Sequence, residues 1–309
     1  MKNERLHNNN KQSFLSRRPV MIAVALFVCL LWGSAYPSIV SSYRLLTINT
    51  DDVFQVILFA GTRFMIAAIL IFIYAFATKK SMRLDFKGFK LVVVLGMLQT
   101  FGQYIFFFLG LRFVHPANGS IVSSLGIFMT VIIAHFVYKS DRLTPKKVWG
   151  FMIGIVGIII LNGGAASTFT FLGEGFLFLA ALLGAIAGVY TKKLTTTLSP
   201  YVITGYQLLF GSTLLIIVGA TFSGNVAFTF TGLSTTLLVY LGFVSAAGFT
   251  LWSALLKHNK VSRVSIYRFS IPVFSVLLSF LFLQEGFDFV SVMIALVFVA
   301  SGIVLINME

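Results

Sequence analysis

The sequence has few charged residues and a single cysteine. Only 10% of its 309 residues are Asp, Glu, Lys or Arg, whereas a soluble domain carries about 25%. Cys29 is the one cysteine, which excludes a disulfide-stapled scaffold. Hydrophobic residues make up 58% of the chain, and a soluble fold of this size would expose too much apolar surface. The composition therefore indicates a protein that lies in a lipid bilayer.

The charges that are present are mostly positive, with 23 Lys and Arg against nine Asp and Glu. In a soluble protein this excess would indicate nucleic acid. Here the basic residues fall between long apolar runs, and no basic stretch outside those runs is interleaved with stacking aromatics. We therefore expect the bilayer as a partner and no nucleic acid.

Ten apolar runs approach or reach the roughly 20 residues that a helix needs to cross the hydrocarbon core. The connections between them are too short to fold as soluble domains. The sequence thus predicts an all-α polytopic membrane protein with ten transmembrane helices. The runs are 20–42, 53–77, 90–112, 117–137, 147–163, 174–191, 200–221, 234–256, 263–284 and 287–307.

Basic residues predict the orientation of these helices. The polar segment 1–19 precedes a run that is longer than a secretory signal and lacks a cleavage site, so we interpret it as a cytoplasmic tail. With this segment inside, nineteen of the 23 Lys and Arg residues lie in cytoplasmic segments, and only Arg44 and Arg112 lie in outer loops. Positive residues accumulate on the cytoplasmic side. Both termini are therefore expected in the cytoplasm, and the protein in the cytoplasmic (inner) membrane.

Three short segments recur at a shift of 144 or 145 residues. The pairs are 61–64 with 205–208, Asp141 with Glu285, and 157–162 with 302–307. The repeating unit contains five spans, and because five is odd, its two copies must cross the membrane in opposite orientations. The sequence thus predicts two inverted five-helix repeats, 20–163 and 174–307, which is an architecture of alternating-access carriers. The alternative is an ancient duplication without a transport role.

Several short motifs resemble one transporter family. They are LWGSAYP at 31–37, Arg63-Phe64, Tyr206-Gln207, and Pro272 followed thirteen residues later by Glu285. In their order and spacing they resemble the EamA-type members of the drug/metabolite transporter superfamily. The resemblance covers about residues 20–307 and implies ten helices, a cavity lined chiefly by helices 1, 3, 4, 6, 8 and 9, and movement of small metabolites, often amino acids and often outward. The first repeat departs from the pattern, because no proline precedes Asp141 at the equivalent place.

Polar residues inside the spans are the candidates for a substrate site, since burying them in lipid is costly. Arg63 lies near mid-depth with no central acid to pair with, and it either binds a substrate anion or clamps two helices. Arg268 either reaches the cytoplasmic surface or faces the cavity as an anion anchor.

Other candidates share a helix face or an unusual depth. Gln99, Gln103 and Tyr104 occupy one face of the third span, where they line a cavity or bond to another helix. Trp32, Tyr36 and Trp252 are either interfacial anchors, as aromatic residues near membrane ends usually are, or part of an aromatic cavity wall. Their depth in the spans is greater than that of usual anchors and favours the cavity wall as much as the anchor. Asn118 and Tyr267 complete the predicted substrate-binding set, although small polar residues of the fourth span also suit close helix packing.

The sequence offers little for catalysis. It contains no Ser/His/Asp set, no His/Cys metal spacing and no phosphate-binding glycine loop, so we expect neither an enzyme nor a cofactor or metal. Asp141 and Glu285 sit at loop junctions, where a cap or a bridge to a neighbouring loop is favoured over a proton site. With no carboxylate at mid-depth, His135, which lies within the fourth span near its cytoplasmic end, is the best titratable group, and uniport or exchange is expected.

The predicted function is secondary transport of small polar or amphipathic metabolites by alternating access. Amino acids or related compounds are the first candidate substrates, and export is the expected direction. A passive channel and a non-transporting membrane scaffold are the alternatives. The small-molecule substrate is the expected soluble partner, and the protein is expected as a monomer or a homodimer.

Overall fold

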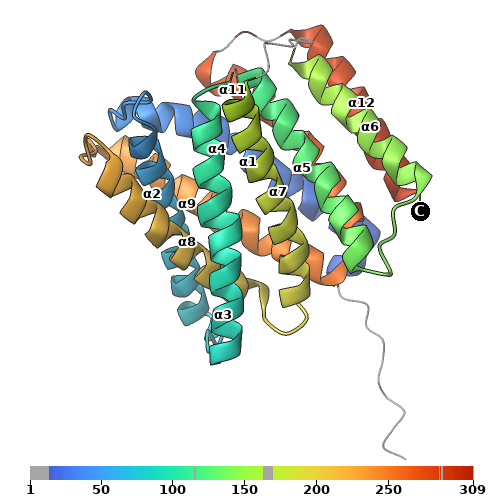
Figure 1. The fold of residues 1–309 in the computed structure, drawn as a ribbon, viewed down its shortest axis with the longest axis horizontal. Helices are drawn as coiled ribbons and strands as arrows, with labels where there is room; N and C mark the ends of the chain where they lie inside the picture. Colours follow the sequence, from blue (N-terminus) through green and yellow to red (C-terminus); the bar gives the residue numbers. More distant parts are fainter. Residues whose placement is uncertain (1–13, 115, 163–169, 285, 287, 309) are drawn as a thin grey trace, which may run out of the picture.

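The computed structural model describes residues 14–114, 116–162, 170–284, 286 and 288–308, and within one helix (α5) the side chains from Val122 onward. The described chain is almost entirely helical (Figure 1). Its elements are η1 (Phe14–Ser16), α1 (Arg18–Leu45), α2 (Val53–Ala77), α3 (Phe86–Leu95), η2 (Gly96–Gly102), α4 (Gln103–Leu111), α5 (Pro116–Val137), α6 (Pro145–Leu161), α7 (Phe171–Leu194), α8 (Pro200–Phe222), α9 (Gly232–His258), α10 (Val261–Ser265), η3 (Ile266–Phe269), α11 (Ser270–Leu283) and α12 (Phe289–Asn307).

Each of the ten apolar runs forms helix, with boundaries within four residues of those predicted. Eight helical segments are long and apolar enough to cross a membrane by length and composition. The other two are α6, which has 17 residues, and α5, whose described apolar part is Val122–Val137. These findings confirm an all-α, multi-span membrane protein.

Local signals in the sequence place the helix starts. Asp52 caps α2 by accepting hydrogen bonds from the backbone N–H groups of Phe54 and Gln55, and Thr231 caps α9 in a reciprocal pair with Ser234. Proline stands in the first turn of α1, α6 and α8, where its missing N–H costs no helical hydrogen bond. The helix ends therefore follow from caps and prolines as well as from apolar length.

The outer surface carries large apolar side chains. Phe76 is 89% exposed and Phe136 is 80% exposed, and many other Phe, Ile, Leu and Val side chains of the helices are more than one-third exposed. A soluble monomer rarely exposes such an extended apolar surface, whereas lipid chains would cover it at no cost. The exposed surface thus agrees with the bilayer environment that the composition indicates.

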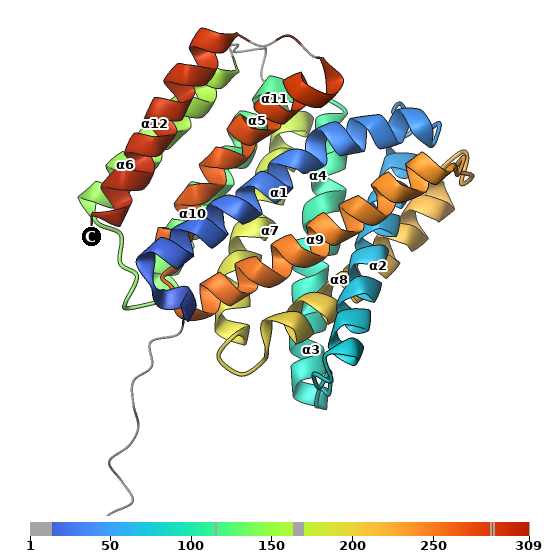
Figure 2. The same ribbon diagram turned by 180° about the vertical axis from the view of Figure 1, so that it is seen from behind.

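Helices from the two halves of the chain pack against each other. α2 packs on α8 and α6 packs on α12, and further close pairs are α5–α7, α1–α11, α1–α9, α4–α7 and α2–α9. The α6–α12 pair lies along one side of the molecule and the α2–α8 pair lies toward the other, with the remaining helices between them (Figures 1 and 2). Among the described residues, the most extensive helix contacts therefore join one half to the other.

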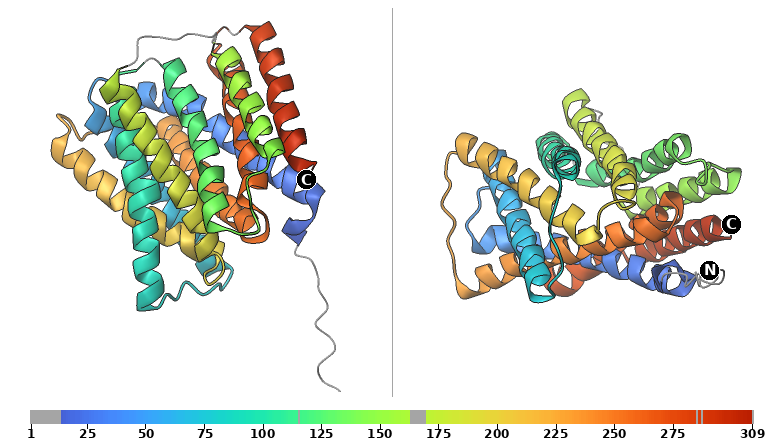
Figure 3. Two further views of the ribbon diagram at one scale, coloured as in Figure 1. Left: turned by 45° about the vertical axis from the view of Figure 1, so that its right-hand side comes forward. Right: turned by 90° about the horizontal axis from the view of Figure 1, so that it is seen from below.

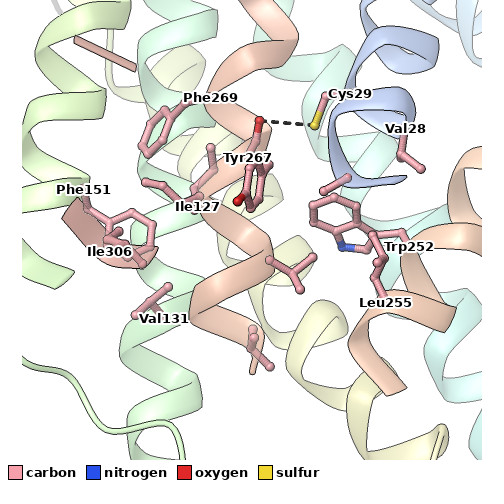
Figure 4. Close-up of a cluster of buried hydrophobic side chains, with 14 of the residues drawn as sticks. Val28, Cys29, Ile127, Val131, Phe151, Trp252, Leu255, Tyr267, Phe269 and Ile306 are labelled. Atoms are coloured by element: carbon pink, nitrogen blue, oxygen red, sulfur yellow. Dashed lines mark hydrogen bonds between the residues drawn. The ribbon is translucent and has the colours of Figure 1, made fainter. Parts of the chain in front are cut away.

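The largest hydrophobic core among the described residues joins α1, α5, α6, α7, α9, α10, η3, α11 and α12. Phe151, Tyr267 and Phe269 are buried in it, and Trp252 lies at its other side (Figure 4). The thiol of Cys29 donates a hydrogen bond to the Tyr267 carbonyl oxygen at 3.2 Å, which links α1 to η3. This core fixes the position of η3, the segment that carries Arg268.

Two of the predicted spans are not regular α-helices. The third span, Phe86–Leu111, contains the π-helical segment η2, and the ninth, Val261–Leu283, contains the 3-10 segment η3 just before Pro272. By contrast, α5 is one uninterrupted helix, as the missing proline of the first half suggests. Such irregular segments within helices occur frequently at functional sites and hinges. Here they carry Gln99, Tyr267 and Arg268.

Candidate functional site

Two arginine side chains lie inside the helical bundle. Arg63 on α2 is only 7% exposed, and Arg268 on η3 is partly buried. The Nε atom of each is fully buried and has no hydrogen-bond partner. Arg63 is the eleventh residue of α2, about 15 Å from the helix start at a rise of 1.5 Å per residue. A guanidinium with an orphaned donor at this depth is costly and marks a functional candidate.

Tyr104 on α4 connects the two arginines. The Arg63 guanidinium carbon lies 5.9 Å from the centre of the Tyr104 ring and 4.5 Å from the Phe64 ring. Arg268 interacts electrostatically with Tyr104 and with Cys29, and its Nε atom is buried. The buried Nε atom is compatible with the inward-facing one of the two roles left open by the sequence, and that role stays a prediction.

No described carboxylate lies at the centre to neutralise these charges. Asp51, Asp52, Asp85, Asp141, Glu174 and Asp288 all lie in loops or in the first turns of helices. The one ion pair between described side chains joins Lys147 and Asp141. Removing an ion from water without a partner costs several kcal/mol, and aromatic faces recover only about 1–2 kcal/mol of it. The centre is therefore strongly electropositive.

Aromatic rings from four helices form a continuous row beside Arg63, which we call the aromatic ladder. It consists of Trp252 (α9), Trp32 (α1), Phe249 (α9), Phe64 (α2) and Tyr104 (α4). Successive ring centres are 5.2, 5.7, 6.3 and 4.6 Å apart. Most of these pairs adopt the edge-to-face geometry that aromatic rings prefer. The ladder brings Trp32, Trp252, Arg63 and Tyr104 together.

The Trp32 indole lies directly against the backbone of α9. A Cβ atom added to Gly248 would come within 2.5 Å of the Trp32 Nε1 atom, so only glycine leaves room for the ring. Two residues further along α1, the Ser34 and Tyr240 hydroxyls are 2.6 Å apart. The α1–α9 contact thus sets where the Trp32 ring stands in the ladder.

Two glutamines of the third span, Gln99 and Gln103, lie in different surroundings. Gln103 lies against α7, because a Cβ on Gly184 would come within 2.8 Å of its Oε1 atom. The Oε1 atom of Gln99 on η2 is buried and has no hydrogen-bond partner. Neither amide makes a hydrogen bond to another described residue. Among the described residues, bonding to a neighbouring helix, one of the two roles considered for these amides, is therefore not seen.

Three other residues of the predicted set lie differently. Tyr267 is 1% exposed and packs within the hydrophobic core, with its hydroxyl unpartnered. Tyr36 is 49% exposed, one helical turn from Trp32. The side chain of Asn118 lies outside the described residues. Their assignment to the site remains a prediction.

Asp141 forms a buried bridge, the role favoured from the sequence. Its carboxylate accepts hydrogen bonds from Lys147 Nζ at 2.9 Å, from the Ser262 N–H at 2.9 Å and from the Ser262 hydroxyl. Burial raises the pKa of Asp141, but the hydrogen bonds from Ser262 and Lys147, with the charge of Lys147, outweigh burial and lower it. Nearby, Lys192 Nζ donates to the carbonyls of Leu256 and Asn259 at 2.8 and 2.5 Å.

The remaining titratable candidates do not lie at the centre. His135 accepts a hydrogen bond at Nδ1 from the Leu143 N–H at 2.9 Å, so this nitrogen holds the loop after α5. Glu285 lies outside the described residues. In the described part of the chain, no group of three or more His, Cys, Asp or Glu side chains could hold a metal ion.

Sequence reasoning missed four members of this centre: Phe64, Phe249, Ser34 and Tyr240. Phe249 precedes Trp252 by three residues on one face of α9, and Phe64 neighbours Arg63, so helical spacing could have found the first. The Ser34–Tyr240 contact joins residues 206 positions apart, and no local pattern predicts it.

The chain is similar to known membrane transporters. A sequence model described as "EamA-like transporter family" matches the chain twice, over residues 19–163 and 171–308. The "Uncharacterized transporter YvbV" of Bacillus subtilis is 26% identical over 301 residues, which covers 96% of this chain and 93% of that protein. The "Uncharacterized transporter YyaM" of the same organism is 27% identical over 72% of this chain and 75% of its own length.

Two further similarities concern substrate and fold. A Salmonella typhimurium protein named "Probable amino-acid metabolite efflux pump" is 26% identical over 70% of this chain and 74% of that protein. A crystal structure titled only "Crystal structure of protein" superposes with a TM-score of 0.78, covering 94% of this chain and 98% of that one at 19% identity. At this identity the structural similarity establishes the fold alone.

Proposed function

Because the chain belongs to the EamA-like transporter family of the drug/metabolite transporter superfamily, a family of membrane transporters and not of enzymes, we propose that it is a secondary transporter of small polar or amphipathic metabolites. Amino acids and related compounds are the first candidates, and export is the direction. The relative named as an amino-acid metabolite efflux pump supports this choice.

The proposed mechanism is alternating access between two inverted five-helix repeats, 20–163 and 174–307. The double family match over nearly the same halves supports the division. The helix packing supports a two-fold relation between the halves. If the halves are exchanged, α1 corresponds to α7, α4 to α9 and α5 to α11, so the pair α1–α9 corresponds to α4–α7 and α1–α11 to α5–α7. All four of these pairs are in close contact.

The strongest support for this proposal is that the arginines and aromatic rings of the centre come from both halves of the chain. Trp32, Arg63 and Tyr104 come from the first half, and Phe249, Trp252 and Arg268 come from the second. A site built from both repeats is the arrangement in which movement of one half against the other exposes it to alternate sides. A scaffold protein would have no use for unpaired arginines at this place.

We propose that the protein lies in the cytoplasmic membrane and that both of its termini face the cytoplasm. The start of α1 and the end of α12 lie at the same end of the bundle as the loop between α5 and α6 (Figures 1 and 3). That loop carries basic residues, including the exposed Lys139 and Arg142. Positive residues favour the cytoplasmic side, which supports the orientation.

Counterflow in proteoliposomes tests the function. Vesicles with the purified protein are loaded with an unlabelled amino acid mixture and diluted into traces of labelled amino acids. A carrier gives saturable, transient accumulation of label that depends on the internal pool, whereas a channel gives only equilibration. Accumulation in protein-containing vesicles, absent from empty ones, is expected. Equilibration without overshoot would indicate a channel, and absence of flux would contradict transport of these compounds.

A further inference from the structure

We infer that the centre binds the negatively charged group of an organic anion, with Arg63 and Arg268 as its two anchors and the aromatic ladder holding the apolar part of the molecule. This inference rests on the proposed transport function and specifies its substrate class. The acidic group is a carboxylate or a phosphate, which share the chemistry that a guanidinium recognises.

The first support is the unused bonding capacity of both guanidiniums. A guanidinium has five N–H donors and no acceptor. The Nε–H groups of Arg63 and Arg268 are buried and unpartnered, and neither side chain makes a hydrogen bond or ion pair with another described residue. An arginine that clamps helices would donate to backbone carbonyls, as Arg18 does to the Asn307 carbonyl oxygen at 2.6 Å. Arg63 and Arg268 make no such contact.

The second support is the sign of the local charge. Both arginines act electrostatically on one residue, Tyr104, and every described acid lies away from the centre in a loop or a first helical turn. A cationic substrate would add a third positive charge there. An anion instead neutralises a charge that the protein already holds without a partner, so its binding is favoured in this poorly solvated place.

The third support is the backbone that presents Arg268. This side chain lies on the 3-10 segment η3, between α10 and α11, rather than on a continuous α-helix. Its neighbour Tyr267 packs within the hydrophobic core, whereas Arg268 has a buried, unpartnered Nε atom and interacts electrostatically with Tyr104, which packs against a different cluster. The irregular turn thus carries one side chain that packs in the core and, next to it, one with an unused buried donor.

The aromatic ladder defines the rest of the ligand. Tyr104 and Phe64 stand beside the Arg63 guanidinium, and Phe249, Trp32 and Trp252 continue the row away from it. Rings bind apolar and planar groups, whereas the arginines bind the charged end. The fitting ligand is therefore amphipathic, with an acidic group at one end and an apolar or aromatic body at the other.

The test compares isosteric probes on the full-length purified protein. Thermal unfolding is measured with 3-phenylpropanoate, with its neutral amide 3-phenylpropanamide, and with inorganic phosphate. The carboxylate is expected to raise the unfolding midpoint and the amide is not, because a ligand of the folded state stabilises it in proportion to its affinity. A shift by phosphate alone would identify a phosphate-bearing ligand. Equal shifts by acid and amide, or no shift by any of the three, would overturn the inference.

Arginine variants test the inference by their stability without ligand and by their affinity for the carboxylate. Arg63→Gln and Arg268→Gln are expected to unfold at or above the wild-type midpoint without ligand, because each removes an unpaired buried charge. Each should weaken carboxylate binding about tenfold to a hundredfold, the range of a lost charged hydrogen bond. Arg63→Lys should retain part of the affinity, and Arg112→Gln, at an exposed arginine, should retain all of it.

The outcomes separate the two proposals. If either Gln variant unfolds several degrees below wild type, its guanidinium supports the fold and the anion inference fails. If counterflow proceeds with neutral or cationic compounds and is unchanged in both Gln variants, transport stands but the anion class is wrong. If no counterflow occurs while the carboxylate binds as expected, the proposed transport function fails and the anion site stands.

Discussion

The backbone N–H of Ser262 donates a hydrogen bond of 2.9 Å to the Asp141 carboxylate, although the two residues are 121 positions apart in the chain. This bond joins the start of α10, in the second half, to the loop after α5, in the first. Lys147 completes the cluster with its ion pair to the same carboxylate. The two halves are thus fastened to each other at the end of the bundle proposed to face the cytoplasm.

Replacing Asp141 by Asn should destabilise the protein. The amide keeps the shape but leaves the Lys147 ammonium buried without its counter-charge, and breaking a buried pair in this way costs about 3 kcal/mol or more. Thermal unfolding in detergent should show a midpoint lower by several degrees. Asp51→Asn, at an exposed loop carboxylate, is the control. An unchanged midpoint for Asp141→Asn would mean that the bridge contributes nothing to stability.

The same pair gives a pH dependence. Because the folded protein lowers the pKa of Asp141, the bridge contributes its full stability above the ordinary aspartate pKa, near 3.9, and loses it as the pH falls through the lower folded value. Wild type should therefore lose stability below about pH 4 more steeply than Asp141→Asn. Parallel curves for the two proteins from pH 7 to pH 3 would contradict the assignment.

Gly248→Ala should disturb the aromatic ladder. The added methyl group would lie 2.5 Å from the Trp32 Nε1 atom, so the indole must move away from its place beside Trp252 and Phe249. We expect weakened substrate counterflow and a loss of about 1–3 kcal/mol in stability, as for other overpacked cores. The matched control is Gly232→Ala at the start of the same helix, where nothing lies within 4 Å of the added atom.

Gln103→Leu separates the two roles considered for that side chain. Leucine preserves much of the volume against Gly184 but removes the amide. Since Gln103 makes no hydrogen bond within the described residues, we expect an unchanged unfolding midpoint and weaker substrate binding in the thermal-shift assay. A lower midpoint with unchanged binding would assign the amide to helix packing instead.

Thiol labelling tests the topology. In a Cys29→Ala background, single cysteines at Ser81, Ser140 or Lys260, all at exposed positions, should resist an impermeant reagent added outside intact cells. They should react after the membrane is opened. Asn259 in the same region is a poor choice, because its amide donates to the carbonyls of Leu15 and Leu255. Labelling of any of the three in sealed cells would contradict a cytoplasmic location for these loops.

The helices could be predicted closely because their determinants are local. Apolar length fixes each span, and residues such as Asp52 and Pro145 fix where a helix begins. The partners within the site were harder to predict. These helices are apolar around most of their circumference, as lipid allows, so periodicity does not tell which face points inward. Arg63 was identifiable because charge in a span is rare, but the Trp32–Gly248 contact depends on how two distant helices rotate and approach.

Asp141 and Arg268 illustrate the same limit. The loop position of Asp141 predicted a bridge, yet its partner Ser262 is set by tertiary packing. Arg268 lies close to the start of the ninth span. From the sequence, its side chain could therefore reach either the cytoplasmic surface or the interior of the bundle. The 3-10 turn that carries it has no clear local signal, since the proline that follows, Pro272, lies within α11.

The most direct test of alternating access is a reversible lock across the two halves. Cysteines replace Ser140 and Lys260, exposed residues on the segments that Asp141 and Ser262 join, in the Cys29→Ala background. A short crosslinker with a thiosulfonate group at each end, which forms a disulfide with each cysteine and releases sulfinate, is added to proteoliposomes. Amino acid counterflow is measured before crosslinking, after it, and after reduction of the disulfides. We expect crosslinking to abolish counterflow and reduction to restore it, and we expect the single-cysteine variants to be unaffected. Full counterflow in the crosslinked protein would contradict transport by movement of the two repeats.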